Sequence, residues 1–541
     1  MTLHVLLDTG FDAARFASAC QEADGRLHYI ALAELPVDTE TLLPEWRAQW
    51  PMWLAGVHRM VSPDGRITLD LWVGEINASL AQLSARVQQV YLAQWPSSLT
   101  VLARLVDDGA LLRAAVCGDA QHAALVKAGF VFDDSGEQAV FCSRRPQPAP
   151  VCPVRRAVVI GAGVAGAAAC ERLAARGWQV TLIERHAQPA SEASGNLAGI
   201  FMPQLSRDDN PSTRLVRAAF LYALRTWQRL GGVGQAFDGA QSGVLQLARD
   251  AAHGAVQRQI AAAHSYPADF AQWLEAPQAS SMLGADAPDG AWWFASSGWA
   301  RPAAVCATLL AACGAQLTRY FSTSALTLER DGSGWLVRDA AGAVIAGAPT
   351  VILAGGTGAV DFAQAASLPL AAVRGQVTHV PQGVLPQLPF VLCRDAYMTP
   401  PSHGTVCVGA TYDMDSDAQL RLASQQDNLE KISAMLQRSV PEAPLAGRTG
   451  FRCVAPDRLP LVGALPDPGV PGRCERLREL PRWPGLHGLL GYASRGLIWA
   501  PLAAELLASE LEGEPLPLEA SLAAALDPGR FLLRERRGGR P

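Results

Sequence analysis

The sequence predicts an α/β protein built of two domains in series, each with a largely parallel sheet covered by helices. The length of 541 residues allows two to four domains of ordinary size. In the first part of the chain, short apolar runs at residues 3–7, 27–32 and 67–73 alternate with helical stretches, which is typical of a sheet with helices on its faces. A connector with four prolines at residues 146–153 then precedes a continuous apolar run at residues 157–160. That run indicates a strand buried on both faces of a second parallel sheet.

Composition excludes intrinsic disorder and narrows the choice of partners. Hydrophobic residues make up 49% of the chain and charged residues 18%, so a large buried core is expected. The net charge of −5 provides no overall positive field, so a nucleic-acid partner needs a local basic patch. Arginine-rich candidates for such a patch, which are more commonly solvated surface, lie at residues 144–145, 155–156 and 534–540.

Cysteine usage and the N-terminal sequence indicate a soluble, cytoplasmic protein without a membrane segment. The 11 cysteines contain no CxxC pair, which predicts neither a disulfide framework nor a zinc site, and no metal is expected. The first residues lack the basic segment of a signal peptide. The longest charge-free stretch, residues 340–360, is interrupted by glycines and Pro349, which favours two buried strands joined by a turn over a membrane helix.

The strand at residues 157–160 opens the clearest motif of the chain. It runs into Gly161-Ala162-Gly163 and Gly166, followed by a helix at residues 167–176 and a second strand at residues 179–183. In such a motif the first glycine permits the turn, the second lets the backbone approach a pyrophosphate, and the third lets the helix pack on the strand. The helix N-terminus offers free N–H groups to the phosphates. The sequence therefore predicts a Rossmann-like dinucleotide-binding domain with Gly161, Ala162, Gly163 and Gly166 at the cofactor.

An acidic residue closes the second strand of this motif. Glu184 lies 18 residues after Gly166 and is followed by Arg185. A carboxylate in this place accepts hydrogen bonds from ribose hydroxyls and repels a 2′-phosphate, which argues against NADP. We expect Glu184 and Arg185 to contribute to cofactor binding. The alternative is that Glu184 is an ordinary exposed acid.

Three later runs favour a flavin over a nicotinamide cofactor. Residues 193–203, 351–358 and 491–497 occur in the order and spacing of the amine-oxidising FAD family that includes glycine oxidase, sarcosine oxidase and D-amino-acid oxidase, which the chain resembles over about residues 157–530. The resemblance implies FAD as the cofactor and an α+β substrate domain inserted into the Rossmann-like domain. It adds the following residues to the cofactor site: Ser194, Gly195, Asn196, Gly199, Ala354, Gly355, Arg495, Gly496 and Leu497.

The same resemblance assigns an arginine to the substrate. Residues 450–463 are similar to the family stretch whose arginine holds the substrate carboxylate, and Arg452 occupies that position. Arginine suits this task because its planar fork donates two parallel hydrogen bonds to a carboxylate and keeps its charge. We therefore expect Arg452 in the catalytic site. The alternative is a salt bridge between Arg452 and Asp457.

A tyrosine and a cysteine complete the expected catalytic site. Tyr397 matches a family tyrosine that supports the carboxylate, although this chain has a Pro-Pro pair at residues 400–401 where the family usually has Pro-Arg. The alternative for Tyr397 is a packed core aromatic. Cys453 adjoins the substrate arginine, and we expect a buried filler rather than a covalent link to the flavin.

Further runs, at residues 177–182, 193–196, 374–377, 451–453, 457–460, 494–497 and 524–528, are similar to one branch of this family: the FAD half of the bifunctional enzymes of tRNA 5-methylaminomethyl-2-thiouridine biosynthesis. The resemblance implies that the chain removes the carboxymethyl group from 5-carboxymethylaminomethyl-(2-thio)uridine at the tRNA wobble position. The products would be glyoxylate and 5-aminomethyluridine. The partner would be tRNA, and the electron acceptor would be oxygen. The alternatives are a free glycine- or sarcosine-type amine oxidase and a non-catalytic flavin-binding protein.

Residues 27–30 and 68–77 are similar to the S-adenosylmethionine-dependent methyltransferase half of the same enzymes, but the cofactor loop departs from it. The family's glycine-rich loop is replaced by residues 8–15, which bring in Asp12 and Arg15. The acid expected after the second strand falls on Ala33, and Glu34 follows one place late, where its side chain points to the opposite face. The acids of a later segment are absent at residues 88–95. We expect a degenerate methyltransferase-like α/β domain that docks tRNA or stabilises the protein and catalyses no methyl transfer.

These patterns define the expected boundaries. Residues 1–145 form the degenerate methyltransferase-like domain, residues 146–156 the proline-rich linker and residues 157–541 the FAD-dependent oxidoreductase. Within the oxidoreductase we expect FAD-binding parts at about residues 157–235, 345–370 and 450–530, and substrate-binding parts at about residues 236–344 and 371–449.

Overall fold

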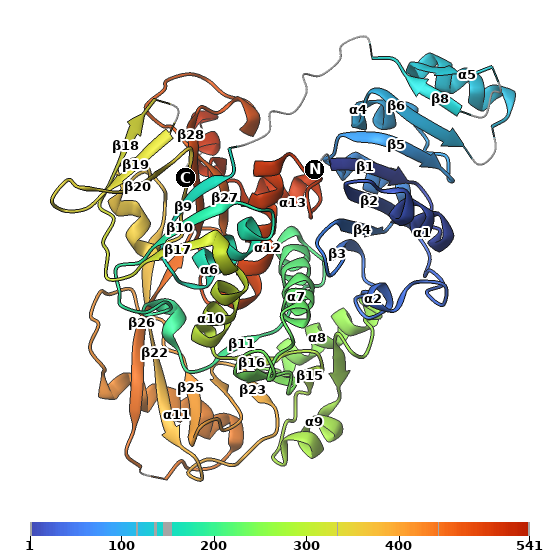
Figure 1. Cartoon of the computed structure of the whole chain (residues 1–541). Helices are drawn as coiled ribbons and strands as arrows, with labels where there is room; N and C mark the ends of the chain where they lie inside the picture. The colour runs from blue at the N-terminus through green and yellow to red at the C-terminus, as the bar shows by residue number, and fades with distance from the viewer. Residues whose placement is uncertain are drawn as a thin grey trace. The chain divides into compact units, whose positions relative to one another are not determined.

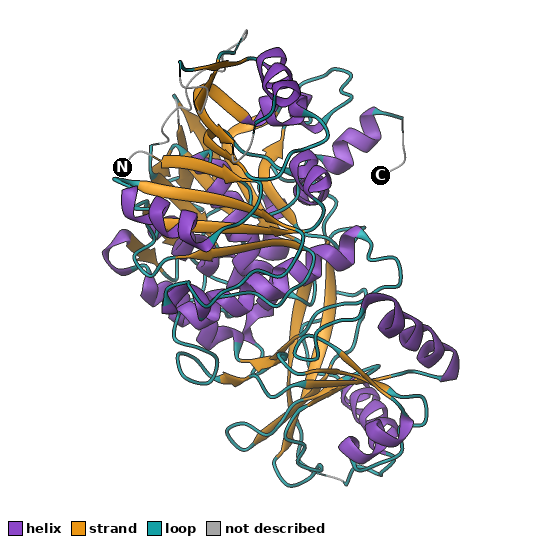
Figure 2. Ribbon diagram, turned by 90° about the vertical axis from the view of Figure 1, so that its right-hand side faces the viewer, coloured by secondary structure: helices purple, strands orange, loops and turns teal. Residues whose placement is uncertain are grey.

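The computed structural model describes residues 3–114, 117–134, 138–143, 154–332, 334–441 and 443–538. Contacts divide the chain into two compact units (Figure 1). The first comprises Met1–Val154 and Glu505–Ala524, and the second comprises Arg155–Ala504 and Ala525–Pro541. Both units contain helices and strands along the chain, which confirms the predicted α/β class; Figure 2 shows the helices and strands by colour. Most of the expected linker, residues 146–153, lies outside the described residues, as do Arg144, Arg145 and Arg540.

The first unit is built on an eight-stranded sheet (blue to cyan in Figure 1). Its strands are β1 (Leu3–Asp8), β2 (Arg26–Ala33), β3 (Gly56–Val61), β4 (Ile67–Val73), β5 (Val87–Leu92), β6 (Val106–Ala114), β7 (Phe130–Phe132) and β8 (Gln138–Phe141). Its helices are α1 (Ala13–Glu22), α2 (Pro44–Arg47), α3 (Ile76–Gln82), α4 (Leu99–Leu105), α5 (Asp119–Ala128) and the C-terminal pieces from α12 (Gly496–Glu512) and α13 (Ala520–Leu526). The three predicted strands correspond to β1, β2 and β4.

The strand order of this sheet is β3-β4-β2-β1-β5-β6-β8-β7. The neighbouring strands β4, β2, β1, β5 and β6 are parallel, whereas β3, β7 and β8 join the edges in antiparallel pairs. The direction of winding reverses between β1 and β5. Doubly wound sheets bind ligands beyond the carboxyl ends of the strands at such a point.

A buried ion network holds residues 505–524 in the first unit. The Arg59 guanidinium, whose side chain is 0% exposed, donates to both carboxylate oxygens of Asp70 at 2.8 and 2.7 Å and to Glu505 Oε1 at 2.8 Å. It also donates to Ser509 Oγ at 2.8 Å and to the Pro515 carbonyl oxygen at 2.6 Å. A buried guanidinium needs such partners to compensate for lost hydration. Residues 505–524 lie within the range 157–541 that the sequence assigned to the oxidoreductase, and these contacts group them with the first unit.

The second unit contains a six-stranded sheet in the order β17-β10-β9-β21-β28-β27. Its strands are β9 (Arg156–Ile160), β10 (Gln179–Ile183), β17 (Leu317–Tyr320), β21 (Thr350–Leu353), β27 (Leu461–Pro466) and β28 (Arg482–Leu490), and all except β27 are parallel. Helix α6 (Val164–Ala174) packs on β9, β10 and helix α10 (Pro302–Ala312). The sequence placed the start of α6 at residue 167, three residues too late, because the glycine motif itself forms the first turn, with Gly163 as its N-cap.

The parts between these strands build a second large sheet, in the order β14-β15-β13-β23-β24-β25-β22-β26. Its strands are β13 (Val244–Leu247), β14 (Gln272–Leu274), β15 (Ala291–Phe294), β22 (Ala371–Pro381), β23 (Val391–Cys393), β24 (Tyr397–Met398), β25 (Thr405–Gly409) and β26 (Ala446–Val454). Helices α8 (Ala251–His264), α9 (Ala276–Leu283) and α11 (Leu422–Leu436) belong to the same inserted parts. The long strands β22 and β26 pair in antiparallel register from Ala371 opposite Val454 to His379 opposite Ala446.

Smaller elements complete the second unit. They are β11 (Gly199–Phe201), β12 (Gly239–Ala240), β16 (Gly298–Ala300), β18 (Thr327–Asp331), β19 (Gly334–Arg338), β20 (Val344–Ala348), α7 (Pro211–Arg229) and α14 (Arg530–Arg536). The charge-free stretch at residues 340–360 forms two strands, β20 and β21, as predicted, but only β21 is buried along its whole length; in β20 only Ala348 is buried, and Pro349 alone separates the two strands. Across the part of the chain that the structure describes, no helix is long and apolar enough to cross a membrane, and no three His, Cys, Asp or Glu side chains gather where they could hold a metal ion.

Candidate active site

A cavity of about 800 Å³ lies in the second unit, lined by both of its large sheets. On one side are the carboxyl ends of β9, β10 and β21, represented by Ile160, Ile183 and Ala354. On the other side are strands of the inserted sheet, including β13, β15 and β26. The Rossmann-like sheet reverses its winding between β9 and β21, so the cavity opens where such sheets bind nucleotides.

The glycine motif forms a tight turn at the floor of this cavity. Gly161 has φ +105°, a left-handed conformation that favours glycine, and a Cβ atom there would lie 2.8 Å from the Ala354 carbonyl oxygen. A Cβ atom at Gly166 would overlap the Gly161 carbonyl oxygen, so helix α6 can pack this closely only with glycine. Gly163 caps α6 without a side chain, which leaves the helix N-terminus facing the cavity. This arrangement fits a pyrophosphate held by backbone N–H groups. Ala162 is fully buried behind the turn.

Glu184 is buried at the end of β10, and the alternative of an ordinary exposed acid is wrong. Its side chain lines the cavity, with the residue 8% exposed. One carboxylate oxygen accepts from the Ala162 N–H at 2.7 Å and the other from the His186 N–H at 2.9 Å. These bonds hold the carboxylate toward the glycine turn, where its remaining lone pairs suit ribose hydroxyls. Arg185 also lines the cavity but is half exposed, and it donates to Glu192 Oε1 at 2.6 Å.

The loop at residues 191–199 is held against the turn by a residue that the sequence analysis missed. Arg448, on β26, donates to the carbonyl oxygens of Ser191 and Glu192 at 2.6 Å each. A Cβ atom at Gly195 would overlap the Arg448 guanidinium, so Gly195 is needed for this contact rather than at the cavity surface. Ser194 Oγ in turn accepts from the Val164 N–H at 3.2 Å. Arg448 reaches this loop because β26 pairs within the inserted sheet. No local pattern in the sequence indicates that contact.

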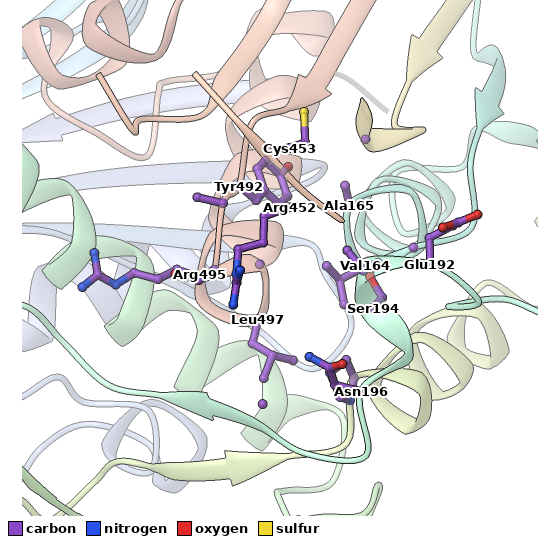
Figure 3. A pocket seen from close by; sticks show the side chains of 18 of the residues that line it. Val164, Ala165, Glu192, Ser194, Asn196, Arg452, Cys453, Tyr492, Arg495 and Leu497 are labelled. Carbon is purple, nitrogen blue, oxygen red and sulfur yellow. Dashed lines mark hydrogen bonds between the residues drawn. The ribbon is translucent and has the colours of Figure 1, made fainter. Parts of the chain in front are cut away.

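The remaining predicted cofactor residues come together from three separate parts of the chain. Asn196 and Gly199 line the cavity from the loop before β11, and Ala354 and Gly355 line it from the end of β21. Arg495, Gly496 and Leu497 line it from the start of α12. Figure 3 shows the Arg495 side chain directed away from Arg452, and its Nη1 donates to Gln204 Oε1 at 2.6 Å. Among the predicted site residues, only Ala162, Gly166 and Gly195 lie behind the cavity surface.

Arg452 extends from β26 into the cavity (Figure 3). Its Nη1 donates to the carbonyl oxygens of Arg374 at 3.2 Å and Thr411 at 3.1 Å, and its guanidinium carbon lies 5.3 Å from the centre of the Tyr412 ring. Burial lowers the pKa of Arg452, yet arginine remains charged at neutral pH. Within the described residues no acid lies at ion-pair distance, so this positive charge is available to an anionic ligand.

The proposed alternative, a salt bridge from Arg452 to Asp457, is wrong. Asp457 is instead bound by Arg530, whose Nε and Nη2 donate to its two carboxylate oxygens at 2.8 and 2.9 Å. Arg530 comes from α14, far along the chain, so the sequence contained no sign of this pairing.

Two tyrosines line the cavity near the arginine. Burial raises the pKa of Tyr397, and the nearby Arg452 charge opposes this effect. Burial likewise raises the pKa of Tyr492, whose hydroxyl has no hydrogen-bond partner among the described side chains and backbone. Tyr492 was not predicted, although it lies within the run at residues 491–497. Both hydroxyls therefore stay protonated and can donate to a ligand. Burial also raises the pKa of the Cys453 thiol to about 11, which agrees with a buried filler.

Comparison with known proteins adds to this geometry. The sequence profile of the FAD-dependent oxidoreductases matches residues 156–510. The chain is 41% identical over 550 residues to the tRNA 5-methylaminomethyl-2-thiouridine biosynthesis bifunctional protein MnmC of Azoarcus sp., which covers 95% of this chain and 86% of that protein. It is also 41% identical over 537 residues to the protein of that name from Burkholderia thailandensis, and this match covers 93% of this chain and 82% of that protein.

Solved structures resemble the fold at lower identity. Glycine oxidase from Geobacillus kaustophilus matches with a TM-score of 0.57 and 22% identity, covering 70% of this chain and 99% of that one. Iminodiacetate oxidase from Chelativorans sp. BNC1 matches with a TM-score of 0.55 and 23% identity, and the match covers 67% of this chain and 96% of that one. Both likenesses concern the fold.

Proposed function

The chain belongs to the family of FAD-dependent oxidoreductases and, over its length, to the MnmC proteins of tRNA 5-methylaminomethyl-2-thiouridine biosynthesis; from this we propose that it oxidises the carboxymethylamino group of wobble uridine in tRNA. The substrate is 5-carboxymethylaminomethyl-(2-thio)uridine, and the products are glyoxylate and 5-aminomethyluridine. Oxygen is the terminal electron acceptor in this proposal, and the reaction takes place in the cytoplasm, where tRNA is found.

The observation that carries the proposal is the Arg452 guanidinium, which has no acid at ion-pair distance among the described residues and lies in a cavity that also contains a dinucleotide cradle. The carboxymethylamino group is a glycine with a large N-substituent. Its carboxylate can accept two parallel hydrogen bonds from one guanidinium. Because Nη1 of Arg452 is already held by the Arg374 and Thr411 carbonyl oxygens, the fork has a defined orientation before the substrate arrives.

The chain's own residues bind and orient the reactants. The cradle of Gly161, Gly163, Gly166 and Glu184 would hold the pyrophosphate and ribose of FAD, and the loops at residues 194–199 and 495–497 would line its ring system. When bound, FAD would supply the acceptor for the hydride of the methylene carbon, and the amine proton would pass to water as the substrate imine forms. Arg452 holds the carboxylate, and the protonated Tyr397 hydroxyl is available to donate to it. Water then hydrolyses the substrate imine, which releases the primary amine and glyoxylate.

An anaerobic assay tests this function against its alternatives. The FAD-loaded protein is mixed with free glycine, with sarcosine, or with tRNA that carries 5-carboxymethylaminomethyluridine, and loss of the flavin absorbance is followed. We expect bleaching with tRNA, together with glyoxylate release and 5-aminomethyluridine in the digested RNA. Bleaching by the amino acids alone would identify a small-amine oxidase. No bleaching with any substrate would identify a non-catalytic flavoprotein.

We also propose that the first unit catalyses no methyl transfer. At the carboxyl end of β1, the Arg15 Nε donates to Asp8 Oδ2 at 3.1 Å, and Arg15 Nη2 donates to the Gly10 carbonyl oxygen. The loop at the switch point of the sheet is thus closed by its own arginine. Glu34 Oε1 accepts from the Ile76 N–H at 3.0 Å, so one of its carboxylate oxygens is occupied by the first residue of α3. Binding of S-adenosylmethionine by the full chain in titration calorimetry would contradict this proposal.

Substitution of Gly166 by alanine should empty the cofactor site. The new Cβ atom would overlap the Gly161 carbonyl oxygen, so α6 must move away from β9, at a cost of about 1–3 kcal/mol in the free energy of unfolding. The purified variant is expected to contain little flavin, which its absorbance spectrum measures. Gly118→Ala is the matched control, because a Cβ atom there lies no closer than 3.6 Å to its nearest neighbour. A yellow Gly166→Ala protein with the normal flavin content would refute the role of this glycine.

A further inference from the structure

Part of the lining of the cavity that contains Arg452 is not used by the mechanism above. Gln246 on β13, Gln257 on α8 and Trp292 on β15 line this part, and we call these three residues the amide wall. They belong to the inserted sheet and to helix α8, and they lie far from the glycine cradle in the sequence. Binding of a carboxylate and an amine at Arg452 leaves the amide wall without a ligand.

Gln246 presents an unused amide to the cavity. It lies opposite Trp292 in the β13–β15 pair and opposite Cys393 in the β13–β23 pair, so its backbone is fixed on both edges of the strand. The side chain is partly buried and lines the cavity, and it makes no hydrogen bond to another residue in the described ranges. A partly buried amide carries two N–H donors and one carbonyl acceptor that call for partners.

The second amide of the wall has a defined orientation. Gln257 Oε1 accepts from the Trp292 indole N–H at 2.7 Å, so the Gln257 amino group is directed to His253, whose Nε2 lies at 3.0 Å. Burial lowers the pKa of His253, so its imidazole is neutral at pH 7. Trp292 is 3% exposed, and its ring stacks on Phe294, with a centroid distance of 6.0 Å and an interplanar angle of 25°. The wall is therefore rigid, neutral and both hydrogen-bonding and aromatic.

These features suit an uncharged heteroaromatic ring with donors and acceptors on its edge. Proteins bind unpaired RNA bases by packing them against aromatic side chains and by hydrogen bonds to their base-pairing edges. None of the three side chains of the amide wall carries a charge that would bind a phosphate. Resting on the function proposed above, we infer that Gln246, Gln257 and Trp292 bind the pyrimidine ring of the wobble uridine while Arg452 holds its carboxymethyl tail.

A base-swap experiment on the full FAD-loaded chain tests this inference. The probes are two anticodon stem–loop RNAs with the same carboxymethylaminomethyl group, attached to position 5 of uridine in one and of cytidine in the other. The wild-type protein is expected to oxidise the uridine form with the lower KM. In Gln246→Leu the KM for the uridine form should rise about tenfold, because a buried partner of the base is lost, while the KM for the cytidine form changes less.

Two further variants separate recognition from folding. Gln259→Leu, on the exposed face of the same helix as Gln257, should retain wild-type kinetics with both probes. Gln246→Glu keeps the shape of the side chain but can only accept, so it should shift the preference toward cytidine, whose amino group donates. Flavin content and melting temperature establish that each variant is folded.

The outcomes are distinguishable. If the wild-type protein oxidises the uridine probe but Gln246→Leu and Gln246→Glu keep its base preference, the amide wall does not read the base. Equal losses for both probes would also overturn the inference, because they indicate a general defect. If the wild-type protein oxidises neither stem–loop, the proposed function itself fails.

Discussion

Replacement of Arg452 by alanine should weaken recognition of the substrate carboxylate by about 2–4 kcal/mol, which corresponds to an increase in KM of about 30- to 1,000-fold. The reason is that Arg452 places a positive charge in the cavity, and among the described residues no acid lies at ion-pair distance from it. Bound flavin should be retained, since the glycine cradle and Glu184 do not contact this side chain. The measurement is KM for the modified stem–loop, together with the flavin absorbance of the purified variant.

A second substrate makes this test specific. A stem–loop in which the carboxylate is replaced by a neutral carboxamide should bind poorly to the wild-type protein and equally poorly to Arg452→Ala. The KM of Arg452→Lys for the carboxylate substrate should lie between those of the wild-type protein and Arg452→Ala, because lysine keeps the charge but not the planar fork. Arg458→Ala, on the exposed turn that follows, should retain the wild-type preference for the carboxylate. If Arg452→Ala keeps that preference as well, the carboxylate is bound elsewhere.

Arg59→Leu should destabilise the first unit by about 3–5 kcal/mol, because it leaves the buried Asp70 and Glu505 carboxylates without their cation. The effect is expected in thermal or denaturant unfolding of the full chain. Arg66→Leu serves as the control, because Arg66 is exposed and its guanidinium donates to the carbonyl oxygens of Ala23 and Gly25. Its effect should stay below about 1 kcal/mol. Equal stabilities of Arg59→Leu and the wild-type protein would show that the network contributes nothing to folding.

The same network predicts how acid acts on the first unit. Burial opposes ionisation of Asp70, but Arg59 and His28 outweigh it and lower the pKa of Asp70 to about 2. An acid whose pKa is lowered by folding contributes stability above its unfolded pKa and loses it as pH falls toward the folded value. The wild-type unit should therefore lose stability between about pH 4 and pH 2. Without the guanidinium the pKa of Asp70 rises, so in Arg59→Leu the acid-induced loss should begin at higher pH.

The sequence by itself determined the nucleotide cradle. The strand, the glycine turn, helix α6, the second strand and Glu184 are contiguous, and their geometry follows from local conformational preferences: a positive φ at Gly161 and close packing at Gly166 need glycine whatever the rest of the chain does. Arg452 could also be found, because its neighbours form a recognisable stretch. The start of α6 was misplaced only because the motif was read as a loop rather than as the first turn of the helix.

Tertiary structure alone decided which distant residues complete each site. Arg448 reaches the loop at residues 191–195 because β26 pairs with β22, and Arg530 takes Asp457 away from Arg452 because α14 lies beside that turn. The amide wall joins Gln246, Gln257 and Trp292 only after β13 and β15 have paired beside α8. Glu505 and Ser509 likewise meet Arg59 across more than 400 residues of chain. Each of these contacts depends on the register of strands and the packing of helices that are far apart in the sequence, and local side-chain patterns contain no information about that register.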